Sequence, residues 1–455
     1  MFSWIPLVLI LFLVTTPRRA VIIAFIGAWL FLPMYGYKLP GLPDYTKVSA
    51  TIYGAMLGVI LFDAGRLMTF RPSLFDIPML VWCLCPFVSA PLNGYELYDG
   101  MSLSVEQVIA WGLPYFIGRL YFSDLEGLRE LAIGIFIGGL IYMPLCLYEI
   151  RMSPQLHAKV YGFFPHDFGQ TKRWGGWRPS VFMQHGLMVG MWMAGATLMG
   201  IWLWFSGIIK RIWGVPVGLF VAGLFITTVM CKSTGAVVLL LGGVMLLFGS
   251  YLFKTKWLVL IAVLIPPLYL GARIQGWNAE EIISASALIH EKRAFSVRYR
   301  VEAEIDLVER AMERPFFGWA GWGRNMILSR KGEDLFAADS MWIIVLGRQG
   351  LVGLTCLGIT MILPGYFLTK RIPVRLWADP VHGSAVAIVT LVIIYTYDNL
   401  FNAMINPVFI LAMGGAMGLG IQRVIHPVSR GAIDQPVYGS MSDGLPLSST
   451  PMKHS

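Results

Sequence analysis

The fold is decided by a polar stretch that contains Ser296-Val-Arg-Tyr-Arg300, then Pro315-Phe-Phe-Gly-Trp-Ala-Gly-Trp-Gly323, and then Asp339-Ser-Met-Trp342. On both sides of it the sequence is a series of apolar segments separated by short polar connections. The interval from Ala272 to Ala338 carries ten acidic and ten basic residues, so it is polar but balanced in charge. We expect an otherwise apolar chain to use so long a polar interval for its activity.

The composition is typical of a membrane protein. Hydrophobic residues make up 56% of the 455 residues and charged residues 13%, whereas about 25% of the residues of soluble proteins are charged. The net charge is +9, but the basic residues occur in short clusters between apolar segments, which argues against nucleic-acid binding. The five cysteines lie within or at the ends of apolar segments. Their spacing fits neither a metal site nor a disulfide framework.

The apolar segments predict an all-α polytopic membrane protein. A helix needs about 20 apolar residues to cross a bilayer, and about thirteen segments approach that length. Because the first two are short, we expect about 12–14 transmembrane helices, with one large periplasmic loop that contains short helices. The candidate segments are residues 2–16, 20–34, 48–62, 74–92, 105–121, 128–150, 181–205, 213–230, 236–253, 257–270, 340–368, 381–397 and 407–424.

Lysine and arginine predict the orientation, because short cytoplasmic loops carry an excess of both. If the segments alternate, the basic connections all fall on one side, which we assign to the cytoplasm. The chain then divides into N-terminal transmembrane helices (1–271), a large periplasmic loop (272–338), C-terminal transmembrane helices (339–424) and a cytoplasmic tail (425–455), which we expect to be disordered. The basic connections contain Arg18 and Arg19, Arg66 and Arg71, Arg119 and Arg129, Lys210 and Arg211, Lys254 and Lys256, and Lys370, Arg371 and Arg375.

The predicted periplasmic loop at 151–180 breaks this charge rule, since it has five basic residues and one acid, Asp167. An anionic ligand at the outer face would explain the positive charge. Alternatively, translocation tolerates a few basic residues in a loop of this length. The basic residues are Arg151, Lys159, Lys172, Arg173 and Arg178.

The large loop contains one amphipathic helix. Val297, Val301, Ile305, Val308 and Met312 recur at helical spacing and predict a single apolar stripe. We expect this helix to lie across the bundle and to end before the proline at position 315. Its polar side places an arginine at 300 one turn from a glutamate at 304, at a spacing that allows an ion pair.

Three residues at the predicted outer face suit chemistry on a phosphate. Arg178 and Arg300 carry planar guanidinium groups, which bind phosphate through paired donors. Asp339, where the loop re-enters the membrane, is a carboxylate that can accept a proton from an attacking hydroxyl. The alternatives are arginines that are ion-paired or reach to the membrane surface, and an aspartate that caps the next helix.

Further candidates have equally plausible structural roles. His185 lies at the end of a predicted span, where a polar residue is either a site residue or a packed one, and Asp398 has the same ambiguity. Trp319 and Trp322 lie among glycines that lack the Lys-Ser/Thr of a phosphate loop. We expect these indoles to rest at the membrane interface or to stack on sugar rings.

With these residues in view, the chain resembles the O-antigen ligase and polysaccharide polymerase superfamily of bacterial inner membranes. The likeness rests on Arg178-Pro-Ser-Val-Phe182-Met-Gln-His185-Gly, on Arg300 followed by a helix and Phe317-Gly318-Trp-Ala-Gly321, and on Asp339-Ser-Met-Trp342 leading into Gly347-Arg348-Gln-Gly350-Leu-Val-Gly353. One position departs from the pattern: ligases of the family usually carry His-Asn where this chain has Asp339-Ser340.

The resemblance implies a metal-independent glycosyltransferase that needs no cofactor. Its donor is a glycan on undecaprenyl pyrophosphate, its acceptor is a second glycan, and its site faces the periplasm of a bacterial inner (plasma) membrane. Arg178 and Arg300 would hold the pyrophosphate, and Asp339 would orient or deprotonate the acceptor. Further substrate-binding candidates are Arg173, His185, Arg298, Trp319, Trp322 and Asp398.

Because of the departure at Asp339, we favour a polymerase of repeat units, for an exopolysaccharide or an O-antigen, over a ligase that transfers glycan to a lipid or other acceptor. The expected partners are the lipid-linked glycan, the acceptor, the bilayer and other polysaccharide assembly and export proteins, with no nucleic acid. A polysaccharide or lipid transporter is the alternative class. Transporters tend to have internal repeats and polar residues at mid-membrane, whereas the predicted spans here are nearly free of charge.

Overall fold

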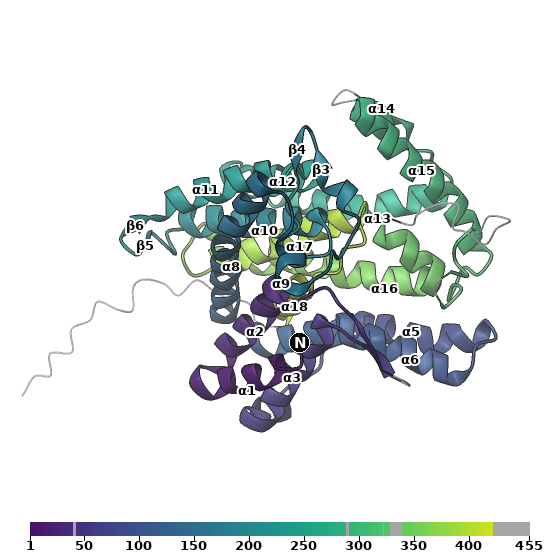
Figure 1. Cartoon of the computed structure of the whole chain (residues 1–455), viewed down its shortest axis with the longest axis horizontal. Helices are drawn as coiled ribbons and strands as arrows, with labels where there is room; N and C mark the ends of the chain where they lie inside the picture. Colours follow the sequence, from purple (N-terminus) through teal and green to yellow (C-terminus); the bar gives the residue numbers. More distant parts are fainter. Residues whose placement is uncertain (40–41, 288–290, 322, 328–338, 422–455) are drawn as a thin grey trace, which may run out of the picture. The chain divides into compact units, whose positions relative to one another are not determined.

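A computed structural model describes residues 1–39, 42–287, 291–321, 323–327 and 339–421 of the chain, and Met1–Gln422 form one unit (Figure 1). The predicted disordered tail at 425–455, the residue Trp322 and part of the predicted large loop lie outside the described residues. In chain order the α-helices are α1 (Trp4–Val14), α2 (Pro17–Phe31), α3 (Lys47–Phe62), α4 (Ala64–Met68), α5 (Ile77–Leu92), α6 (Leu97–Gln107), α7 (Leu113–Tyr121), α8 (Leu125–Met152), α9 (Leu156–Tyr161), α10 (Gly186–Phe205), α11 (Val217–Met230), α12 (Thr234–Leu252), α13 (Trp257–Ile274), α14 (Glu280–Ala287), α15 (Glu291–Met312), α16 (Met341–Arg371), α17 (Gly383–Asn399) and α18 (Pro407–Met417).

The all-α prediction is confirmed, and each of the predicted apolar segments contains a helix. Within the described residues, six helical stretches are long and apolar enough to cross a membrane: Leu74–Leu92, α8, α10, α12, α13 and α16. Shorter apolar helices are α1, α3, α11, α17 and Pro407–Gly420. The total number of spans and the side on which the large loop lies stay predictions.

Short elements connect these helices. The single helical turns are η1 (Leu74–Asp76), η2 (Val108–Gly112, a π-helical turn), η3 (Phe168–Thr171), η4 (Val374–Leu376) and η5 (Gly418–Gly420). Three antiparallel two-stranded hairpins pair β1 (Tyr37–Leu39) with β2 (Leu42–Tyr45), β3 (Lys172–Arg173) with β4 (Gly176–Trp177), and β5 (Arg211–Ile212) with β6 (Val215–Pro216).

The helix α10 lies at the centre of the described bundle. It is almost completely buried and packs against α8, α11, α12 and α17. The closest helix crossing is that of α7 with α18, where a Cβ atom on Gly118 would lie 2.1 Å from the Leu411 carbonyl oxygen and one on Gly414 would lie 2.1 Å from that of Tyr115. Small residues allow such close approach between helices in a membrane, so the two glycines fix this contact.

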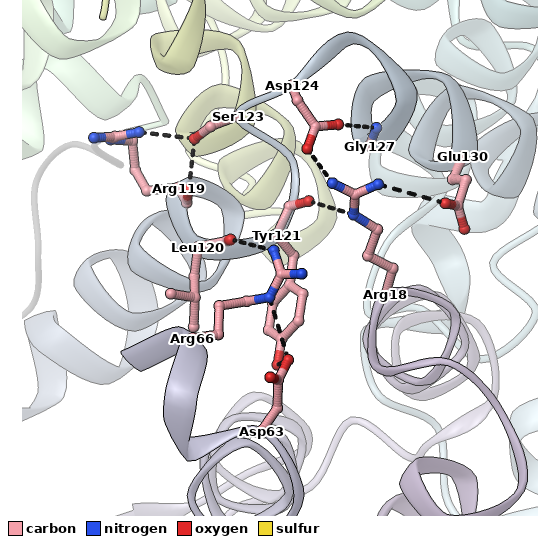
Figure 2. Close-up of polar contacts among 10 residues, drawn as sticks. All are labelled: Arg18, Asp63, Arg66, Arg119, Leu120, Tyr121, Ser123, Asp124, Gly127 and Glu130. Atoms are coloured by element: carbon pink, nitrogen blue, oxygen red, sulfur yellow. Dashed lines mark hydrogen bonds and ion pairs between the residues drawn. The ribbon is translucent and has the colours of Figure 1, made fainter. Parts of the chain in front are cut away.

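A polar cluster forms around the turn between α7 and α8 (Figure 2). Arg18 and Arg66 donate hydrogen bonds to the backbone carbonyls of Tyr121 (3.0 Å) and Leu120 (3.3 Å). Arg119, at the end of α7, forms an ion pair of 2.8 Å with the carboxylate of Asp76. Three of the basic connections that the sequence places on one side of the membrane therefore meet at one turn. Carboxylates balance the other two arginines: Asp124 and Glu130 contact Arg18, and Asp63 contacts Arg66.

The loop helix α15 packs against α16, but its buried face differs from the predicted stripe. Val301 and Val308 are buried, whereas Ile305 and Met312 are 40% and 38% exposed. The side chain of Val297 lies outside the described residues. The face is rotated because it also buries the charged residue Glu304, which the apolar periodicity did not include.

The long helix α16 is broken at Gly350, whose φ of 65° and ψ of −163° are not helical. A break frees carbonyls before it and N–H groups after it, and both must be satisfied inside an apolar bundle. The segment 315–320 satisfies them. Its N–H groups at 319 and 320 donate to the carbonyls of Gly347 (2.8 Å) and Arg348 (2.9 Å), and its carbonyls at 315 and 316 accept from the N–H groups of Leu351 (2.7 Å) and Val352 (3.1 Å).

The helix α5 covers the other side of this break. Ser89 donates its hydroxyl to the carbonyl of Phe317, and the amide of Asn93 donates to the carbonyl of Gly318 at 2.8 Å. The Pro-Phe-Phe-Gly segment that the sequence marked is thus a backbone clamp between the two halves of α16, and it fixes the N-terminal half that carries Asp339 and Arg348.

Candidate functional site

A cavity of about 400 Å³ lies beside the N-terminal half of α16. Its walls come from α6 and η2, from the segment before α10, from the start of α16 and from residues 403–405. The polar residues that line it are Glu106, Gln107, His166, Gln184, His185, Asp339, Arg348 and Gln349.

A smaller hollow of about 20 Å³ adjoins it and is lined by Arg178. The side chains of His166, Gln184 and His185 line both spaces. Arg178 therefore lines a space that shares three residues with the main cavity but does not line that cavity itself.

Arg300 and Asp339 form an ion pair at the cavity, with 3.0 Å between Nε and Oδ2. Their side chains are 34% and 45% exposed, so both can reach a ligand. The N-cap position of α16 is occupied by Ser340. The alternative role of Asp339 as the cap of this helix is therefore wrong, and its carboxylate faces the arginine.

A buried triad sets the position of this pair. Arg273 on α13 contacts Glu304 on α15 at 3.1 Å, and the hydroxyl of Ser340 donates to the same carboxylate at 2.6 Å. The ion pair that the spacing of residues 300 and 304 allows is not formed, because each has a different partner from another element. Burial raises the pKa of Glu304. The arginine and glutamate side chains are only 1% and 8% exposed, and loss of one partner from such a pair costs about 3–5 kcal/mol.

Arg178 is 2% exposed and is positioned by its loop. Its Nη2 donates to the hydroxyl of Ser233 at 3.2 Å. It also needs the glycine at 186, where a Cβ atom would lie 2.6 Å from the arginine Cδ. The carboxylate of Glu149 holds the following turn by accepting the N–H groups of Ser180 (2.9 Å) and Val181 (2.7 Å).

His185 lies directly before α10, and its ring is held in one orientation. Nδ1 accepts a hydrogen bond from the N–H of Leu187 at 3.0 Å, so the proton is on Nε2, which faces the Gln170 side-chain oxygen at 3.3 Å. Burial, and after it the charges of Arg178, His166, Arg173 and Arg300, lower the pKa of His185 to about 3. The imidazole is neutral and lies in a strongly positive field.

Arg173 adds a third guanidinium to this field. It is the last residue of β3, and the β3–β4 turn at Trp174 and Gly175 has φ values of 50° and 67°, as in a type I′ hairpin. Burial lowers the pKa of Arg173, and so does the charge of Arg300. Arg173, Arg178 and Arg300 are therefore all close enough to His185 to lower its pKa, and Asp339 lines the same cavity as His185. Such a cluster is suited to binding a multiply charged anion.

Among the described residues, the candidates Trp319, Arg298 and Asp398 do not line the cavity. The indole of Trp319 lies beneath the guanidinium of Arg310 at 3.7 Å and donates to that residue's carbonyl. Arg298 is exposed two residues before Arg300, and so points to another side of α15. Asp398 is buried and accepts a hydrogen bond of 2.6 Å from Asn402. Trp322 lies outside the described residues.

Two charged cavity residues were absent from the predicted site. Arg348 belongs to a motif used for the family resemblance, but it was not assigned a role. Glu106 lies on α6 immediately before the π-helical turn η2, which also lines the cavity. Glu106 is the single acidic residue of the predicted span 105–121, and that was the available signal. Glu149 and Arg273 were missed because their partners are distant in sequence.

Comparison of the chain with models of known protein families and with curated proteins gave no match.

Proposed function

We propose that the protein is a membrane glycosyltransferase that uses a glycan carried on undecaprenyl pyrophosphate. The observation that carries this proposal is the cluster of Arg173, Arg178 and Arg300 around a neutral His185, beside Asp339, at a cavity large enough for a substrate. Paired arginines are suited to a pyrophosphate leaving group, because their charge remains fixed while negative charge develops on it.

In the proposed reaction, a hydroxyl oxygen of the acceptor glycan forms a bond to the anomeric carbon of the donor. The bond from that carbon to the pyrophosphate oxygen breaks, and its electron pair leaves with the lipid pyrophosphate. The hydroxyl proton passes to a carboxylate, and Asp339 orients or deprotonates the acceptor. Arg178 and Arg300 stabilise the charge on the leaving group.

The test is turnover by purified protein in detergent with undecaprenyl-pyrophosphate-linked oligosaccharide, followed as released undecaprenyl pyrophosphate. Arg300→Ala and Arg178→Ala should each lower the rate by about 10²–10³-fold, as loss of one transition-state donor does. Arg211→Ala is the matched control, because this arginine is exposed in the β5–β6 hairpin. Size-exclusion elution shows whether each variant is folded. Wild-type rates in both folded variants would refute the mechanism.

Polymerase and ligase differ in the acceptor. The aspartate at 339, where ligases of the resembled family carry histidine, favours the polymerase. Analysis of the product separates the two: a polymerase yields a ladder of repeat units on undecaprenyl pyrophosphate, and a ligase yields glycan on a different lipid or acceptor.

We also propose that the chain lies in a bacterial inner membrane, with the cavity on the periplasmic side and 12–14 spans. The meeting of Arg18, Arg66 and Arg119 at one turn supports a shared, cytoplasmic side for these connections. Single cysteines introduced at Arg71 and Glu309 test this, because an impermeant reagent should label only the second one from the periplasm.

The broken helix α16 is a feature that transporters also use to bind substrates and ions. Here, however, two carbonyls before the break (347 and 348) and two N–H groups after it (351 and 352) are bonded to residues 315–320. They offer no ligand site, so this break does not favour a transporter. Turnover in detergent, without a second compartment, would distinguish the two classes.

A further inference from the structure

The cavity has a second charged end, formed by Glu106 on α6 and Arg348 on α16. The carboxylate of Glu106 lies within electrostatic reach of the Arg348 guanidinium. That guanidinium is anchored from the opposite side, because its Nε donates to the Ala320 carbonyl at 3.3 Å. The clamp at the helix break therefore fixes this end of the cavity as well.

The two charged ends lie at different depths. Arg348 follows Met341, the first residue of α16, by seven residues of helix that precede the break. At 1.5 Å per residue this is about 10 Å along the helix axis. Asp339 directly precedes α16 and pairs there with Arg300 of α15, so Arg348 lies about 10 Å farther along the same wall, which is more than the length of one sugar ring.

The wall around Glu106 has the composition of a carbohydrate site. Trp82 and Trp111 both line the cavity, with their ring centroids 6.1 Å apart; they are 2% and 3% exposed and give this wall an apolar surface, which suits the apolar face of a sugar ring. Amides supply hydroxyl partners: the side chain of Gln349 donates to that of Gln107 at 3.1 Å, and Gln107 donates to the Trp82 carbonyl at 2.8 Å. These amides are held in fixed orientations.

The carboxylate at the other end is already occupied. Asp339 is bound by Arg300 at 3.0 Å, and the arginine cluster beside it attracts anions. The arginine end is thus suited to pyrophosphate, and the end with Glu106, two tryptophans and two amides is suited to neutral sugar.

We infer that the Glu106 end of the cavity is the acceptor subsite, and that Glu106 takes the proton of the acceptor hydroxyl. This inference rests on the proposed glycosyl transfer. The acceptor oxygen gains its bond to the anomeric carbon while its hydrogen moves to a Glu106 carboxylate oxygen, and the pyrophosphate leaves at the arginine end with the electron pair. Asp339 then positions Arg300 on the leaving group and does not accept the proton.

The experiment measures transfer and donor binding separately on the full chain. Glu106→Gln should lower transfer by about 10²–10⁴-fold, the usual contribution of a general base, while binding of undecaprenyl pyrophosphate changes less than about threefold. Glu106→Asp should restore part of the rate, because it returns the carboxylate. Glu309→Gln is the matched control, because this glutamate is exposed on α15. Thermal unfolding verifies that each variant is folded.

Each outcome decides the matter. If Glu106→Gln transfers at the rate of the Glu309→Gln control, the acceptor subsite is wrong and the glycosyltransferase proposal stands. If Asp339→Asn instead loses transfer with unchanged donor binding, the proton acceptor is Asp339. If the wild-type protein transfers no glycan, the proposed function fails and the subsite fails with it.

Discussion

The clamp between the segment 315–320 and the broken helix α16 makes a sharp prediction for Gly350→Ala. The φ of 65° and ψ of −163° at Gly350 are essentially restricted to glycine, and strain of this kind costs about 1–3 kcal/mol. A Cβ atom there would also lie 2.4 Å from the backbone carbon and oxygen of Phe316, which cannot move without leaving α16. Separation would break the bonds to the N–H groups of Leu351 and Val352. At about 1–3 kcal/mol for each unsatisfied group, the total loss is about 3–9 kcal/mol.

The assay is thermal unfolding in detergent, followed by intrinsic fluorescence and by the fraction that stays monodisperse. The control is Gly358→Ala, a glycine in the same helix with no atom within 4 Å of an added Cβ. Alanine is favoured over glycine in a helix by about 1 kcal/mol, so this control should be as stable as wild type or slightly more stable. Equal unfolding temperatures for the two variants would show that the backbone clamp does not stabilise the protein.

Three further predictions concern charged and titratable groups. Because the pKa of His185 is lowered to about 3, the folded state binds fewer protons than the unfolded state in acid. The contribution of His185 to the free energy of unfolding should be complete above about pH 6.5 and fall by about 2–3 kcal/mol by pH 4.5. Unfolding measured over a series of pH values should show this loss in wild type and not in His185→Gln. Arg273→Met should cost about 3–5 kcal/mol by leaving Glu304 buried without its cation, and the double variant Arg273→Met/Glu304→Met should regain most of it, as a double-mutant cycle would reveal. Glu149→Gln should lower donor affinity and increase protease cleavage within residues 153–181, because a single amide oxygen replaces the carboxylate that holds this loop. Unchanged cleavage would contradict that role.

The helices were predictable because the signal for each is local. The length of the apolar run alone identifies α8, α10, α12, α13 and α16, and no information from elsewhere in the chain is needed. The break at Gly350 was not predictable, because a glycine inside an apolar run is compatible with a continuous helix. It becomes a break only because residues about 30 positions earlier supply partners for the freed groups.

The candidate site divides in the same way. Arg178, Arg300 and Asp339 stood out because charge is rare in an apolar chain, and the structure places all three around one pair of connected spaces. For Arg300 the sequence offered a possible partner one helical turn away, because spacing along the chain reveals only local pairs. Its actual partner is 39 residues distant. The buried face of α15 was misassigned for a related reason. Glu304 lies on that face because it pairs with Arg273 on another helix, which the sequence pattern does not reveal.

Two buried carboxylates connect the stability of this protein to its proposed chemistry. Glu149 fixes the loop that carries Arg178, and Glu304 fixes the helix that carries Arg300, although neither lines the main cavity. The position of each arginine therefore depends on a buried carboxylate that links its segment to another element. Substitution of either carboxylate should reduce turnover by displacing an arginine, and lower temperature or added donor should recover part of it, because both favour the docked arrangement. Substitution of Arg300 itself removes a group that contacts the substrate, and neither treatment should restore it.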